Sequence, residues 1–223
     1  ESTDKLYINK VDSSTFITLP SSPQTNDIMP ASVIIEHPHD HPNTTCLYIK
    51  PAFIIINKSD ISLFVKLSDT VCGLISQNNY LPVRSIEPSM NAEIIMLNTV
   101  TQINLLEISS FSILLSDNIS LIVETNVIDS VKYITFQTEK CRRSFAFIND
   151  TDLSFSFIQK DYNYDFKFNV YPNSALLFDL PDSRLPPILC IENLSDKIDM
   201  ESPKETTALD SDVFYRVEMG EYG

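Results

Sequence analysis

Short runs of β-branched and aromatic residues recur along the whole chain and are separated by Asn, Asp, Ser and Pro. Residues 52–56 form a continuous apolar run, whereas residues 61–67 and 153–158 alternate apolar with polar side chains. That alternation places Ile61, Leu63, Val65 and Leu67 on one strand face, and Leu153, Phe155 and Phe157 on another. No stretch keeps a helical apolar period over more than two turns. The sequence therefore predicts an all-β chain of sandwiches with apolar interiors.

Glycine and histidine are too scarce for most catalytic motifs. The 223 residues include three Gly, at positions 73, 220 and 223, so the chain has no glycine-rich phosphate loop and no nucleophile elbow. All three His fall within residues 37–41, which leaves no dispersed acid–base set. We therefore expect a protein that is not an enzyme and that binds no cofactor.

The charge of the chain narrows the range of partners. The chain has sixteen Lys and Arg and thirty Asp and Glu, which gives a formal net charge of −14 at pH 7. Such a surface repels nucleic acid and anionic lipid. No run of apolar residues is long enough to span a bilayer. The sequence thus predicts no nucleic-acid partner and no direct contact with a membrane.

Two segments of the chain match each other 92 positions apart. Residues 52–60 read AFIIINKSD and residues 144–152 read SFAFINDTD. Phe, Ile, Asn, a hydroxyl residue and Asp recur in the same order, and the following strands also correspond. Further on, residues 86–89 align with residues 170–173 through Pro88 and Pro172. A match at so many kinds of position indicates tandem β-sandwich repeat modules.

The repeated asparagines, Asn57 and Asn149, are the candidate functional residues. Each ends an apolar strand and precedes x-Ser/Thr-Asp and a second strand. Asn tolerates left-handed dihedrals and bonds backbone groups two residues further on, so it organises a strand–turn–strand corner. We interpret both side chains mainly as residues that form a buried turn. The same corners could also shape a peptide- or adaptor-binding groove.

The corner and the residues after it resemble the adaptor-binding repeats of the vacuolar protein sorting thirteen family. The second copy carries Phe147-Ile148-Asn149-Asp150-Thr151, then Gln159, Tyr171-Pro172 and Phe178-Asp179-Leu180-Pro181. The first copy shares Asn57 and Pro88, but Leu67 stands in place of the Gln. Phe178 stands where the family usually has Trp. The resemblance covers about residues 50–195.

The resemblance implies a function. Members of this family are bridge-like lipid transfer proteins, and their adaptor-binding region recognises short Pro-x-Pro motifs in organelle-resident adaptors. The chain would then be cytoplasmic and peripheral at endosome, mitochondrion or vacuole contact sites, reaching membranes only through adaptors. A Pro-rich peptide is already extended and loses little entropy on docking. The acidic surface would favour adaptors with basic residues beside the motif.

The repeat also sets the expected boundaries. Residues 1–50 would be the end of a preceding repeat and a loop, and residues 51–142 one β-sandwich repeat. Residues 143–223 would be a second repeat with an acidic loop and a last strand. Within these, the sequence predicts a hairpin of residues 111–115 with 121–123. It also predicts loops over Pro20–Pro30 and Asp196–Asp212.

Two alternative functions stay open. Five N-x-Ser/Thr tripeptides and four cysteines would suit a secreted or viral Ig-like β-sandwich recognition module. The asparagines concerned are Asn43, Asn57, Asn118, Asn149 and Asn193. The cysteines, Cys46, Cys72, Cys141 and Cys190, hold different places in the two copies, which favours free thiols. The chain could also be a purely structural spacer between other repeats.

Two small clusters complete the candidates. His37, His39 and His41 have metal-like spacing, but prolines interrupt them and only Asp40 accompanies them, so we expect a solvated loop and no metal. Arg142-Arg143 stands just before the second copy in an acidic chain. That pair is either a local surface feature or a contact for a partner's carboxylate.

Overall fold

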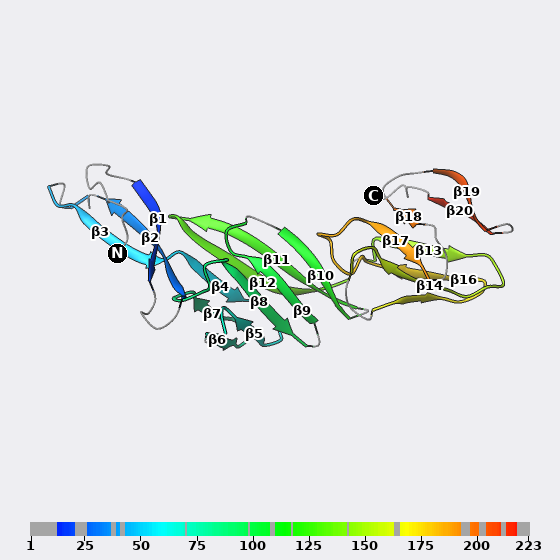
Figure 1. Ribbon diagram of the computed structural model, residues 1–223, viewed down its shortest axis with the longest axis horizontal. Coiled ribbons are helices and arrows are strands. Elements are labelled where there is room, and N and C mark those ends of the chain that lie inside the picture. The colour runs from blue at the N-terminus through cyan, green and yellow to red at the C-terminus, as the bar shows by residue number, and fades with distance from the viewer. Residues whose placement is uncertain are drawn as a thin grey trace. The chain divides into compact units, whose positions relative to one another are not determined.

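Strands account for all the regular secondary structure of the described residues in the computed structural model, which confirms the all-β fold (Figure 1). The structure describes residues 13–20, 26–36, 39–40, 43–69, 71–97, 99–107, 110–116, 118–141, 143–162, 166–192, 197–200, 204–210 and 213–217. The first half of the chain forms β1 (Ser13–Pro20), β2 (Ile28–Glu36), β3 (Cys46–Pro51), β4 (Phe53–Asn57), β5 (Leu63–Lys66), β6 (Cys72–Ile75), β7 (Asn79–Pro82), β8 (Asn91–Met96) and β9 (Thr99–Asn104). The second half forms β10 (Ser110–Ser116), β11 (Ile119–Ile128), β12 (Val131–Lys140), β13 (Phe145–Asn149), β14 (Phe155–Gln159), β15 (Phe168–Val170), β16 (Ser174–Phe178), β17 (Ile188–Ile191), β18 (Lys197–Asp199), β19 (Lys204–Asp210) and β20 (Val213–Val217).

The chain divides into two units. The first comprises residues 1–110 and 122–138, and the second comprises residues 111–121 and 139–223. Strand β10 belongs to the second unit except for Ser110, and β11 is divided between the units after Leu121. All but the last two residues of β12 belong to the first unit. The second unit's continuous part begins at residue 139, close to the predicted boundary between 142 and 143.

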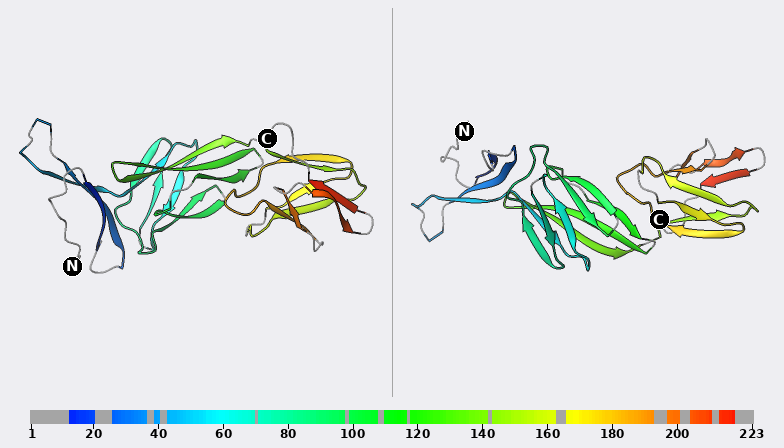
Figure 2. Two further views of the ribbon diagram at one scale, coloured as in Figure 1. Left: turned by 90° about the horizontal axis from the view of Figure 1, so that it is seen from above. Right: turned by 60° about the horizontal axis from the view of Figure 1, so that its bottom comes forward.

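The first unit holds one layer of β6-β5-β8-β9 and a second layer in which β4 lies between β12 and β7. Figure 2 shows these layers from two further sides. Buried residues alternate with less buried ones along β4, β5 and β8, as is typical of a sandwich. Phe53 and Ile55 of β4, and Leu63 and Val65 of β5, are at most 2% exposed. The predicted inner face of residues 61–67 is thus correct for Leu63, Val65 and Leu67, while Ile61 is only half-buried.

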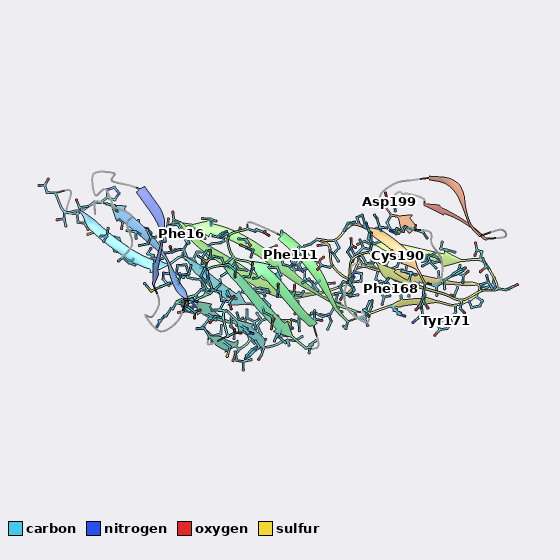
Figure 3. The ribbon with its side chains drawn as sticks, viewed as in Figure 1. Phe16, Phe111, Phe168, Tyr171, Cys190 and Asp199 are labelled. Atoms are coloured by element: carbon cyan, nitrogen blue, oxygen red, sulfur yellow. The ribbon has the colours of Figure 1, made fainter. Side chains whose placement is uncertain are left out.

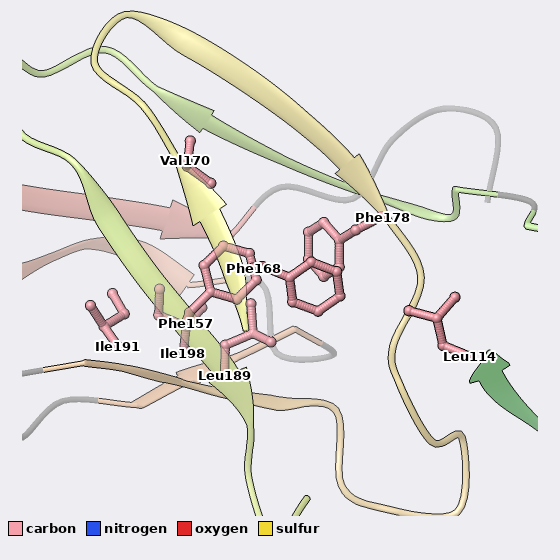
Figure 4. Packing of buried hydrophobic residues seen from close by; sticks show 8 residues of the cluster. All are labelled: Leu114, Phe157, Phe168, Val170, Phe178, Leu189, Ile191 and Ile198. Atoms are coloured by element: carbon pink, nitrogen blue, oxygen red, sulfur yellow. The ribbon is translucent and has the colours of Figure 1, made fainter. Parts of the chain in front are cut away.

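The second unit has its own core, between β13-β16 and the sheet β15-β14-β17-β18. Phe157 lies at its centre and is fully buried. Its ring is 5.1 Å from that of Phe168 and 5.3 Å from that of Phe178 (Figure 4). Aromatic rings at such distances contribute beyond the apolar area they bury. Leu153, by contrast, precedes β14 and is 54% exposed, so its predicted inward position is wrong.

The strands of the two units pair in the same order. β4 pairs with β7 and β13 with β16, and the Asn that ends the first strand lies opposite Asn79 in one ladder and Ser174 in the other. β5 lies between β6 and β8, and β14 between β15 and β17. β8 then pairs with β9 as β17 pairs with β18.

This correspondence corrects one sequence alignment. The turn at Pro172 and Asn173 joins β15 to β16, so its counterpart is the turn at Gln77 and Asn78 between β6 and β7. Pro88 instead lies between β7 and β8. The connection before the turn is longer in the second unit, because residues 160–167 join β14 to β15 whereas residues 67–71 join β5 to β6. The corresponding turns are therefore 95 positions apart, at Asn78 and Asn173, which is not the offset that the sequence alignment used.

The predicted loops are also shorter than expected. Pro20 ends β1 and Pro30 lies within β2, opposite Thr18. The acidic segment Asp196–Asp212 contains β18 and β19. β10 and β11 are neighbours, in agreement with the predicted hairpin.

Left-handed backbone is common at the turns and involves no glycine. Among the described residues, Asn78, Met90, Leu97, Asp129, Ser130, Arg143, Asp161 and Asn173 have φ between 48° and 64°. Only two of them are Asn, so the chain does not depend on Asn alone to replace Gly at its turns.

Candidate functional site

Asn57 closes the corner between β4 and β5 with its whole amide group. Its Nδ2 donates to the carbonyl oxygens of Ile61 and Ile75 at 2.8 and 2.9 Å. Its Oδ1 accepts from the backbone N–H of Ser59 at 3.0 Å and from the Ser59 hydroxyl at 2.6 Å. The side chain is fully buried. Its polar atoms are therefore satisfied within the protein.

Asn149 makes the same set of bonds between β13 and β14. Its Nδ2 donates to the carbonyl oxygens of Leu153 and Tyr171 at 2.7 and 2.8 Å. Its Oδ1 accepts from the backbone N–H and the hydroxyl of Thr151 at 3.1 and 2.8 Å. The residue is 2% exposed. Each Asn thus ties its own corner to the end of a strand that is distant in sequence.

These hydrogen bonds limit how Asn149 can contribute to ligand binding. A buried amide with two accepted and two donated bonds has no atom left for a ligand. It can act on binding only through the shape of what it holds. These contacts agree with the interpretation of both asparagines as turn formers. Their role in adaptor binding stays a prediction.

The element that Asn149 holds is the turn between β15 and β16. The Tyr171 carbonyl oxygen also accepts from the Ser174 hydroxyl at 2.7 Å. The Asn173 backbone N–H donates to the Thr151 carbonyl oxygen at 3.1 Å, and Asn173 has a φ of 50°. This short turn is consequently fixed to the Asn149 corner at several points.

A cavity of about 630 Å³ lies beside this turn in the second unit. Residues of β15 and β16 and of the segments before and after them line it. Phe166, Phe168, Leu176 and Phe178 are among its apolar lining residues, and Tyr171, which also lines it, is 68% exposed. Figure 3 labels Phe168 and Tyr171 on the ribbon of this unit. The volume is typical of sites that take small ligands or short peptide segments.

Charged groups at the cavity already have partners. Arg143 Nη2 donates to Asn118 Oδ1 at 2.9 Å, and Lys167 Nζ lies 2.6 Å from Glu192 Oε1. Asp179 accepts from the backbone N–H groups of Arg143 and Ser144 at 2.9 and 2.8 Å. The cavity is therefore close to neutral, although the chain as a whole is strongly acidic.

Gln159, which the family resemblance singled out, holds a loop. It is fully buried at the end of β14. Its Nε2 donates to the Asp182 carbonyl oxygen at 2.8 Å, and its Oε1 accepts from the Asp182 backbone N–H at 2.9 Å. Nε2 also lies within bonding distance of the carbonyl oxygens of Leu185 and Pro186. Gln159 thus organises the segment that follows the cavity wall.

The resemblance did not reveal the cavity as a whole. Of its lining, the resemblance indicated Tyr171, Phe178 and Asp179. Asn118 was indicated only as a possible glycosylation site and Arg143 only as part of a basic pair. Phe166 and Phe168 went unnoticed. Their two-residue spacing just before a Pro-containing turn was the signal that could have indicated them.

The other small clusters contribute little. His37, His41, Arg142 and Asn193 lie outside the described residues. Within the described part of the chain, no group of His, Cys, Asp or Glu side chains could hold a metal ion. The four cysteines are free thiols. No helix of the described residues is long and apolar enough to cross a membrane.

A search against protein-family models found no match for this chain, and no curated protein matches it.

Proposed function

We propose that the chain is a tandem pair of β-sandwich repeats that binds short Pro-x-Pro motifs of organelle-resident adaptor proteins. It would thereby help to target a lipid transfer protein to membrane contact sites in the cytoplasm. The cavity beside β15 and β16 is the proposed binding site. On this proposal the chain carries no catalytic step, needs no cofactor and meets membranes only through adaptors.

The aromatic residues in the lining of the cavity are the observation that carries the proposal. Proline rings pack well on aromatic faces, and grooves that recognise Pro-rich segments are lined by aromatic side chains. Tyr171 and the half-buried Phe166 supply accessible aromatic surface in the cavity, and the buried Phe168 and Phe178 are also part of its lining. A Pro-x-Pro segment is extended before it binds, so little conformational entropy is lost on docking.

The Asn149 corner supports the same proposal. Its bond to the Tyr171 carbonyl oxygen fixes the backbone that carries the exposed Tyr171 ring. The family resemblance assigns importance to the Asn at this position. The geometry supplies a physical route by which a buried side chain would control an exposed binding wall.

The repeat itself is supported by two independent correspondences. Three of the four hydrogen bonds of each asparagine correspond position by position between the units. The fourth goes to the carbonyl oxygen of the last residue of β6 in one unit and of the residue just after β15 in the other. The strand pairings that follow each corner are also equivalent in order. A spacer would share both features, so peptide binding is what separates the two functions.

A fluorescence-anisotropy titration tests the proposal. A labelled Pro-x-Pro peptide is titrated with the full chain, beside a matched peptide in which Ala replaces both Pro. We expect saturable binding of the first peptide and a loss of binding for the second. Tyr171→Ala should weaken binding, whereas Tyr80→Ala, at an exposed position of β7 in the other unit, should not. Equal binding of the two peptides would contradict the proposal.

A further inference from the structure

Strand β4 of the first unit is paired on both sides. β4 pairs with β7 on one side and with β12, in parallel, on the other. The parallel ladder runs from Lys132 opposite Phe53 to Phe136 opposite Asn57. Two further bonds close its ends: Lys132 N–H to the Ala52 carbonyl oxygen at 2.8 Å, and Lys58 N–H to the Phe136 carbonyl oxygen at 2.7 Å.

The corresponding strand of the second unit has one open edge among the described residues. β13 pairs with β16 alone. Its exposure differs accordingly, because Phe53 and Ile55 of β4 are buried whereas Phe145 and Phe147 of β13 are only half-buried. Ile148 is 66% exposed. Among the described strands, β15 and β16 also have one unpaired edge each, but so do their counterparts β6 and β7. Of the strands that the structure describes, β13 is therefore the one that lacks a neighbour present beside its counterpart, β4.

Strand β3 has an open edge and resembles the kind of strand that would pair with β13. β3 is the last strand of the meander β1-β2-β3 and directly precedes β4, just as β12 ends the meander β10-β11-β12 and precedes β13. β3 reads Leu47-Tyr48-Ile49 where β12 reads Lys132-Tyr133-Ile134. Among described strands β3 pairs only with β2, and Leu47, Tyr48 and Ile49 are 49%, 40% and 60% exposed.

Backbone directions at the two edges are complementary. The bond from Ala52 N–H to the Pro30 carbonyl oxygen shows that Ala52 faces β2, so the N–H groups of Leu47 and Ile49 point to the open side. On β4, the bond from Val83 N–H to the Phe53 carbonyl oxygen shows that Phe53 faces β7. By the same alternation, Ala146 and Ile148 of β13 point their backbone groups to its open edge.

We propose that β3 of one copy of this chain adds in parallel to β13 of a second copy. Leu47 would lie opposite Phe145 and Pro51 opposite Asn149, which repeats the pairing of β12 with β4. Pro51 lacks an N–H, so the new ladder has one donor fewer than its template. The two surfaces differ from each other, so the contact is heterologous and generates open chains or closed rings of copies.

The test is the oligomeric state of the full chain in solution. Light scattering after size exclusion is measured over about a hundredfold range of protein concentration. We expect the mean mass to rise above the 25.3 kDa of one chain without stopping at a dimer. A mass that stays at one chain throughout would overturn the proposal, and would leave the β13 edge to another kind of partner.

Proline variants identify the edges. Ile148→Pro removes an N–H that points to the open edge of β13, and Ile49→Pro does the same on β3. Each variant alone should be monomeric. An equal mixture should form a two-chain complex and nothing larger, because each variant retains one intact edge. Leu177→Pro is the matched control, since its N–H points to the outer edge of β16 and its side chain is 53% exposed.

Folding of the variants is checked by circular dichroism and thermal melting. Where a proline variant does not fold, Ile148→Lys with the control Leu177→Lys serves the same purpose, because a charged side chain at an edge opposes strand addition. Association that survives both β13 variants, or a mixture that stays monomeric, would overturn the proposal.

Discussion

The buried amide of Asn149 donates a hydrogen bond of 2.8 Å to the carbonyl oxygen of Tyr171, an exposed residue of the cavity wall. One atom of a nearly inaccessible side chain therefore sets the backbone position of a residue that a peptide would touch. The same amide group closes the corner between β13 and β14. Changes at this residue should consequently affect binding and stability together.

Asn149→Ala should weaken Pro-x-Pro peptide binding while the second unit still folds. The carbonyl oxygens of Leu153 and Tyr171 lose their donor, which should cost about 1–3 kcal/mol of unfolding free energy. Peptide affinity should fall roughly tenfold, about 1.4 kcal/mol. Anisotropy titration and denaturant unfolding measure the two effects.

Asn57→Ala is the matched control for that experiment. It removes the same four bonds from the first unit, where the Asn is fully buried. We expect a similar or larger loss of stability and wild-type peptide affinity. Wild-type affinity of Asn149→Ala, or an equal loss in Asn57→Ala, would contradict a role for the second corner in binding.

Gln159→Leu should destabilise the second unit although the first unit carries Leu67 at the corresponding position. Leucine fits an apolar core, but the Asp182 backbone N–H and carbonyl would both lose their buried partner. The expected loss is about 1–3 kcal/mol, measured by denaturant unfolding. Gln159→Glu retains the acceptor and lacks the donor, so it should also destabilise. A neutral effect of Gln159→Leu would show that the loop finds other partners.

Lys132→Met should destabilise the first unit. The Lys132 amine donates to the carbonyl oxygens of Leu105 and Leu106 at 2.9 and 2.5 Å, and lies 3.3 Å from that of Glu107. Methionine keeps the length of the side chain but leaves these oxygens without that donor. We expect a loss of about 1 kcal/mol, since the site is half-exposed, and a partial recovery in Lys132→Arg. Thermal melting measures both.

The same lysine predicts a pH dependence. Burial lowers the pKa of Lys132 below the ordinary lysine value of 10.5. Between the lowered value and 10.5 the unfolded chain binds more protons than the folded chain, so this group makes stability rise with pH in that interval. Urea unfolding at increasing alkaline pH should show that the unfolding free energy of the wild type rises relative to that of Lys132→Met. If the difference in unfolding free energy between the two proteins did not change with pH, this prediction would be refuted.

Adaptor association should depend on salt when basic residues flank the motif. The net charge of −14 attracts a basic peptide over distances that ionic screening shortens. Raising the ionic strength from low to physiological values should slow association more than it changes dissociation. Stopped-flow binding of peptides with basic and with neutral flanks measures this, and equal salt dependence of the two would contradict the role of the charge.

The sequence was sufficient for the fold class because two-residue alternation is kept in strands such as β5 and β14. Leu63, Val65 and Phe157 show this most clearly. The same rule failed for β18 and β19, where charged and small residues outnumber apolar ones. It also failed for Leu153, because alternation does not indicate where a strand begins.

The candidate site was predictable only in part. The Asn corners are local, and each is defined by a few consecutive residues. The cavity unites segments from residues 114 to 179, so its shape depends on pairing that no local pattern contains. The Pro88 alignment failed for a related reason, since a change in connection length shifts a sequence comparison while the strand register stays unchanged.

The left-handed turns show that this chain has not reached its highest attainable stability. Met90, Leu97 and Arg143 hold backbone angles that cost an L-residue roughly 1–2 kcal/mol and a glycine almost nothing. Replacing the residue at such a position by glycine should stabilise the protein where the side chain lies outside the apolar cores. A glycine at one of these turns could offset a destabilising change at a binding surface, so that surface can diverge while the sandwiches persist.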